Sequence, residues 1–88
     1  MKIKDGFMIR EVGGAYVVVP VGERSVQFNG MVNLNEIGAF IWKVLEKGAE
    51  KQDVIDAILE EYDVTRETAE KDADQFINVL KENNILEM

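Results

Sequence analysis

Carboxylates are the only side chains in this sequence that are numerous enough to suggest acid–base or metal chemistry. The 88 residues include 17 Asp and Glu but no His and no Cys. The commonest general base, the commonest metal ligand and the thiolate nucleophile are therefore all missing. A nucleophilic triad also needs a base beside its Ser, Cys or Thr, and neither His nor Cys is present to build one. The composition argues against an enzyme, and we expect no cofactor.

Some carboxylates could nevertheless form small sites. Asp72 with Asp74, or the adjacent pair Glu60-Glu61, could be imagined as an acid and a base. Three others share a helical spacing that could hold a hard cation: Asp53, Asp56 and Glu60. Adjacent helical residues such as Glu60 and Glu61 point in different directions, however. The spacing of the other three carboxylates is one that any exposed helix face offers. We interpret these carboxylates as solvated faces of amphipathic helices and predict no metal site.

The net charge of −7 is unevenly distributed along the chain. Residues 1–34 carry four basic and three acidic residues, whereas residues 35–88 carry six basic and fourteen acidic residues. An acidic C-terminal half repels phosphates, which argues against a nucleic-acid partner. No apolar run could span a bilayer, and the N-terminal MKIKDG lacks the apolar segment of a signal peptide. We expect a soluble cytoplasmic protein with no membrane partner.

The hydrophobic pattern changes period near residue 34, and before that point it predicts three strands. Phe7–Val12 and Ala15–Val19 are rich in strand-forming residues, and Gly13-Gly14 between them suits a tight hairpin turn. The third segment, Val26–Leu34, has the clearest alternation, with apolar residues on one face and mostly polar residues on the other. Its apolar face is predicted to lie on the core.

After residue 34 the apolar residues recur with the 3.6-residue period of helices. The pattern predicts three helices, over residues 35–47, 51–62 and 66–83. Asn35 and Thr65 are placed to cap the first and third of them. Trp42 lies off the centre of the first apolar stripe, so we expect it to cover a flank of the core. The tail Ile85-Leu86 is apolar enough to pack back onto the domain.

Three antiparallel strands followed by three helices define an α+β, winged-helix-like domain over residues 1–88. Many winged helices bind DNA through their third helix, which must then offer cations to phosphates and bases. Here the third helix carries three basic residues, Arg66, Lys71 and Lys81, against five acidic ones. That balance disfavours DNA binding, which stays open as the weaker alternative.

The predicted third strand is the best candidate for a binding surface. If sheet order follows chain order, Val26–Leu34 is an edge strand, and it contains no charged residue or proline to block pairing. An unprotected edge beside an apolar helix flank can accept an extended peptide as an added strand. Phe76 and Val79, with Asp72 and Gln75 beside them, are candidates for that flank. The pattern alone equally allows the edge to be covered by the chain's own tail or by a homodimer partner.

Three segments between residues 34 and 87 carry a family resemblance. Leu34–Trp42 combines a Leu-Asn pair with a small residue and an Ile-Trp, and Leu59–Val64 ends in Tyr-x-Val. Asp72–Leu80 reads D-x-x-x-F-I-x-x-L and is followed by an ILE close. In order and spacing these segments resemble the PqqD family, over residues 7–87. Pro20-Val21 stands where that family often has Pro-Glu, so the chain looks like a PqqD-like relative.

The resemblance implies a winged-helix-like fold and a non-catalytic role as a peptide chaperone, also called a precursor-peptide recognition element. In that family the leader of a ribosomally made precursor peptide adds to the third strand and lies between it and the third helix. The domain then presents the peptide to a modifying enzyme, commonly a radical S-adenosylmethionine protein. Carried over to this sequence, the resemblance implies these peptide-binding residues: Val26, Gln27, Phe28, Asn29, Met31, Val32, Asp72, Gln75, Phe76 and Val79.

Overall fold

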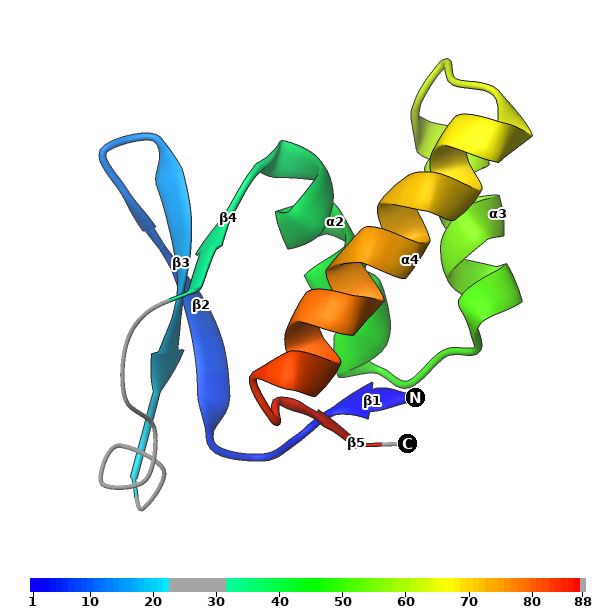
Figure 1. Cartoon of the computed structure of the whole chain (residues 1–88). Helices are drawn as coiled ribbons and strands as arrows, with labels where there is room; N and C mark the ends of the chain where they lie inside the picture. The colour runs from blue at the N-terminus through cyan, green and yellow to red at the C-terminus, as the bar shows by residue number, and fades with distance from the viewer. Residues whose placement is uncertain (23–31, 88) are drawn as a thin grey trace.

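The computed structural model describes residues 1–22 and 32–87, and over these ranges it contains two antiparallel sheets and three helices (Figure 1). The larger sheet has the order β2-β3-β4, formed by Phe7–Val12, Ala15–Pro20 and Val32–Leu34. The smaller sheet pairs β1 (Lys2–Ile3) with β5 (Leu86–Glu87). The predicted α+β class, with a three-stranded antiparallel sheet followed by three helices, is confirmed.

The hairpin forms where the glycines predict it. β2 and β3 pair in a register that ends at Val12 opposite Ala15. Gly13 and Gly14 between them have φ values of +57° and +85°, which residues with a side chain rarely adopt. β3 then pairs with β4 on its other side, with Tyr16 opposite Leu34. Within the described residues β4 therefore has a strand neighbour on one side, and residues 26–31 of the predicted third strand lie outside those residues.

The helices begin at the predicted caps. α2 spans Glu36–Glu46, α3 spans Lys51–Glu61 and α4 spans Arg66–Glu82. The Asn35 side chain accepts a hydrogen bond from the Gly38 N–H at 2.8 Å, and the Thr65 hydroxyl accepts one from the Thr68 N–H at 3.2 Å. Such bonds satisfy N–H groups that a helix leaves unpaired in its first turn. In the part of the chain that the structure describes, no helix is long and apolar enough to cross a membrane.

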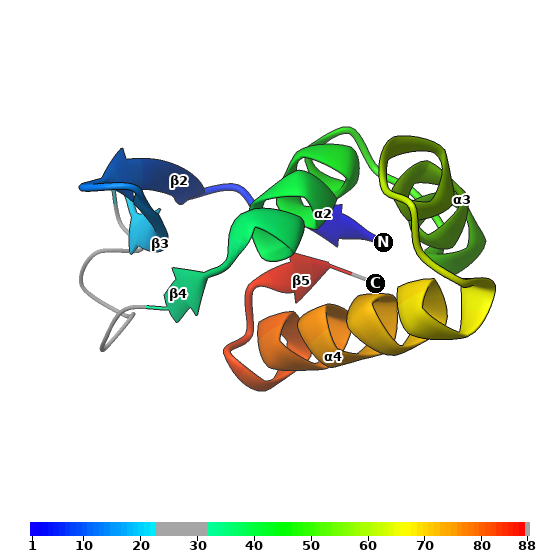
Figure 2. The ribbon, with the colours of Figure 1, turned by 90° about the horizontal axis from the view of Figure 1, so that it is seen from above.

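The core lies among the three helices and the small sheet. Seen from above, β1 and β5 lie between α2 and α4, and the three-stranded sheet stands at the side where β4 leads into α2 (Figure 2). Trp42 is completely buried, so its expected place on a flank is wrong. The reason is that α2 contacts β1, α3 and α4 together, so more than one face of this helix is covered.

The C-terminal tail packs back onto the body, as predicted, but it does so by pairing with the N-terminus. The Ile85 carbonyl accepts a hydrogen bond from the Lys4 N–H at 2.8 Å, and the Ile85 N–H donates to the Leu80 carbonyl at 2.9 Å. Asn84 turns the chain out of α4 with a φ of +58°. The tail thus pairs with β1 and not with β4. The alternative in which the tail covers the edge strand is therefore wrong for β4.

Replacing Asn35 with Ala is expected to lower the free energy of unfolding by about 1 kcal/mol, because the first turn of α2 loses its side-chain acceptor. Urea denaturation followed by tryptophan fluorescence measures this change. Asn33→Ala is the control, since Asn33 is exposed in β4 and caps no helix. An equal loss in the two variants would contradict the capping role.

Candidate peptide-binding site

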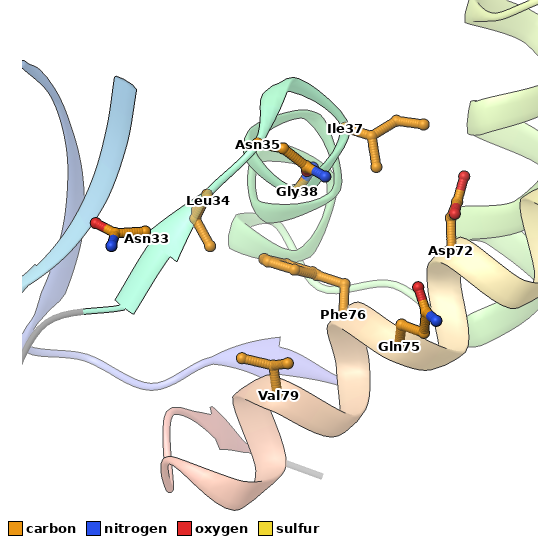
Figure 3. Close-up of a pocket in the computed structure, with 9 residues that line it drawn as sticks. All are labelled: Asn33, Leu34, Asn35, Ile37, Gly38, Asp72, Gln75, Phe76 and Val79. Carbon is orange, nitrogen blue, oxygen red and sulfur yellow. The ribbon is translucent and has the colours of Figure 1, made fainter. Parts of the chain in front are cut away.

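A pocket of about 200 Å³ opens between the end of β4, the first turn of α2 and the middle of α4. We call it the β4–α4 pocket. Figure 3 shows the side chains that line it. Nine of the described residues line it: Asn33, Leu34, Asn35, Ile37, Gly38, Asp72, Gln75, Phe76 and Val79.

Helical spacing places the α4 side of the pocket on one face. Asp72, Gln75, Phe76 and Val79 follow one another at i, i+3, i+4 and i+7, the positions that share a helix surface. Phe76 is 8% exposed and forms the floor, whereas Val79 is 37% exposed at one end. The α4 side therefore offers an apolar surface that a second molecule can reach.

Gly38 permits the close approach of α2 and α4 at this point. A Cβ atom at Gly38 would lie 3.1 Å from Cε1 and 3.3 Å from Cδ1 of the Phe76 ring, tighter than ordinary contact. It would also lie 3.2 Å from the Asn35 carboxamide oxygen that caps α2. The absence of a side chain at Gly38 thus lets the Phe76 ring lie close to the first turn of α2.

Five of the ten residues implied by the resemblance can be placed, and four of them meet in the pocket. Those four are the α4 residues Asp72, Gln75, Phe76 and Val79. Val32 lies in β4 opposite Val18 and is half-buried, next to the pocket but not in its walls. The other five fall outside the described residues: Val26, Gln27, Phe28, Asn29 and Met31.

The opposite wall consists of residues 33–35 with Ile37 and Gly38. Its strand part, residues 33 and 34, belongs to the predicted edge strand, whereas the part at the start of α2 was not predicted from the sequence. Ile37 lies in the apolar stripe of its helix and Leu34 on the apolar face of its strand, so the hydrophobic pattern alone predicts a place in the core for both. The available signal was Gly38 itself, because a glycine inside a helical pattern often marks a close packing contact.

The chemistry of the pocket suits binding. Of the described residues in its walls, Asp72 alone is charged, and the others are apolar or carry amides. In the ranges that the structure describes, no three acidic residues are grouped so as to hold a metal ion. Asp53 instead accepts a hydrogen bond from the Glu50 N–H, and Asp56 accepts from Gln52 and pairs with Arg66. These two carboxylates thus serve a helix start and a contact between helices.

Tyr62, at the end of α3, has a raised pKa. Burial raises the pKa of its hydroxyl, and the negative charges of Glu36 and Glu61 raise it further. Tyr62 therefore stays protonated at neutral pH. Its ring packs edge-on against Phe40 with centroids 5.4 Å apart, which is a structural contact away from the pocket.

A three-stranded antiparallel sheet, three helices and a pocket between the last sheet strand and the last helix define a winged-helix-like binding domain. The family model described as coenzyme PQQ synthesis protein D (PqqD) matches residues 15–86. The chain therefore belongs to the PqqD family, and the resemblance found in the sequence is confirmed.

Two solved structures are similar to the whole chain. One is described as TbiB1 in complex with the TbiA(beta) leader peptide; it is 30% identical, with a TM-score of 0.76, over 99% of this chain and 95% of that chain. The other is lasso peptide synthetase B1 complexed with the leader peptide; it is 25% identical, with a TM-score of 0.72, over 96% and 93% of the two chains. No curated protein matches this chain.

Proposed function

We propose that this protein is a peptide chaperone that binds the leader of a ribosomally synthesised precursor peptide and presents it to a modifying enzyme. The observation that carries the proposal is the β4–α4 pocket, which lies beside a sheet edge and has an apolar floor. Both similar solved structures are described as complexes with leader peptides, which supports the same role here. The protein itself catalyses nothing and works in the cytoplasm, and its partner enzyme is of the radical S-adenosylmethionine type or another peptide-modifying class.

The binding mechanism follows from the two sides of the pocket. The leader adds to β4 as a further antiparallel or parallel strand, and its backbone hydrogen bonds give affinity that tolerates many sequences. An apolar leader side chain seats on Phe76 and Val79 and gives specificity. Because a free leader is disordered, part of the interaction energy offsets its ordering, so we expect a Kd on the order of 1 μM.

Isothermal titration calorimetry with a synthetic leader tests the proposal. The peptide is that of the short precursor encoded nearest to this gene, with a scrambled version of it as the control. We expect saturable binding of the leader near micromolar concentration and none of the scrambled peptide. Binding of a DNA duplex in place of the leader would overturn the proposal in favour of the winged-helix alternative. A stable dimer that takes up no leader would overturn it in favour of a structural dimerisation domain.

Replacing Gly38 with Ala is expected to weaken leader binding about 5-fold without unfolding the protein. The new methyl carbon would lie 3.1 Å from Cε1 of Phe76, which is closer than ordinary van der Waals contact. The ring must therefore move into the pocket. The gain in helix propensity of up to about 1 kcal/mol offsets part of the packing strain. Calorimetry and urea denaturation measure the two effects separately. Unchanged affinity in Gly38→Ala would show that the leader does not contact Phe76.

A further inference from the structure

Asp72 is the residue of the β4–α4 pocket whose presence the fold does not explain. It is half-buried, and its carboxylate projects from α4 on the side of Ile37 (Figure 3). Among the described residues it makes no hydrogen bond and no ion pair, and no Lys or Arg lines the pocket. Asp74, two residues further along α4, is by contrast paired with Lys51.

The position of Asp72 within α4 brings no local stabilisation either. It is the seventh residue of the helix, beyond the first turn in which the helix dipole favours a carboxylate. The positions three and four residues away hold no cation: Thr68, Ala69, Gln75 and Phe76. Asp is also a poor helix former in a helix interior. A carboxylate that weakens its own helix and has no partner among the described residues is best explained by a partner on a second molecule.

We propose that Asp72 determines specificity by selecting leaders that carry a Lys or Arg beside their apolar anchor. This inference rests on the proposed function and names the charge of its ligand. Asp72 and Phe76 lie one helical turn apart, roughly 5–6 Å. Residues two positions apart on an extended peptide share one face at roughly 7 Å. A basic residue two positions from the anchor therefore falls near Asp72, and its methylene stem can lie over Ile37.

The expected contribution of this ion pair is moderate. Because the carboxylate is half-buried, the pair lies between an exposed salt bridge and a desolvated interface pair, and we expect about a 5-fold effect on affinity. Added salt should reduce that effect, since the site stays in contact with solvent. Asp72→Asn should leave the protein folded and at least as resistant to heat, because no interaction within the described chain is lost.

Selection from a displayed library of random peptides of about ten residues, longer than a typical strand, tests the inference without knowledge of the natural leader. The targets are the wild type, Asp72→Asn, Asp72→Lys and the control Glu70→Gln. Glu70 is exposed on α4 and lies outside the pocket, so its variant makes the same charge change elsewhere. We expect the wild type and the control to enrich Lys or Arg two positions from an apolar residue. Asp72→Asn should keep the apolar preference and lose the basic one, and Asp72→Lys should enrich Asp or Glu.

The possible failures of the two proposals are distinguishable. Enrichment of the same basic residue by Asp72→Asn and by the wild type would overturn the role of Asp72 and leave peptide binding in place. Absence of any apolar anchor in every selection would overturn peptide binding itself, and this inference with it. A selected peptide in which Met replaces the basic residue gives the quantitative check. Its affinity should fall about 5-fold for the wild type and stay unchanged for Asp72→Asn.

Discussion

Replacing Val79 with Glu is expected to weaken leader binding about 30-fold or more while the protein stays folded. Val79 is 37% exposed at one end of the β4–α4 pocket, so its side chain contributes little to the core. A bound leader would cover the new carboxylate and remove it from water without supplying a partner, which costs about 2 kcal/mol or more. The carboxylate of Asp72 lines the same pocket, so the new carboxylate is also repelled by a like charge. Calorimetry with the leader measures the loss.

Val12→Glu is the matched control for this variant. Val12 is 62% exposed at the tip of β2 and is not part of the pocket, so the same substitution adds the same charge at a distance from it. We expect its affinity for the leader to equal that of the wild type. If both variants lost affinity equally, the cause would be net charge, and the pocket would lose its support as the binding site.

Replacing Ile85 with Ala is expected to lower the free energy of unfolding by about 2–4 kcal/mol. Its side chain is completely buried, and its backbone bonds to both Leu80 and Lys4. The substitution therefore leaves a cavity where the C-terminal tail joins the core, in a domain small enough for that loss to be a large part of its stability. Urea denaturation measures the change.

Glu87→Ala tests whether that loss arises from the core. Glu87 is exposed in the same short strand, β5, and its truncation should change stability by less than about 0.5 kcal/mol. Ile85 lies outside the β4–α4 pocket, so the folded fraction of Ile85→Ala should bind the leader normally. A loss below about 1 kcal/mol for Ile85→Ala would contradict its place in the core.

The elements that local chemistry determines were predictable from the sequence. Gly13-Gly14 specifies the hairpin through backbone conformation, and Asn35 and Thr65 specify helix starts through their side-chain oxygens. β1 was not predicted, because a strand of two residues shows no alternation and exists only through its pairing with β5. The burial of Trp42 was missed for a similar reason, since it depends on how many elements surround α2.

Two sides of the candidate site were predictable from the sequence, and the third was not. The α4 wall follows from helical spacing around Phe76, and the strand side follows from the uncharged edge that ends at Leu34. The α2 side depends on the close approach of two helices at Gly38, which is a tertiary contact with no period in the sequence. Asp72 was already a candidate for the flank of the groove, but that it lacks a charged partner among the described residues depends on tertiary contacts that the sequence does not show.

The most direct test of strand addition is an NMR measurement on isotopically labelled protein saturated with the leader peptide. The account predicts cross-strand nuclear Overhauser contacts between the leader backbone and the backbone of β4, together with contacts from a leader side chain to Phe76 and Val79. Leader contacts confined to other faces of the helices, with none to β4, would contradict strand addition at this edge.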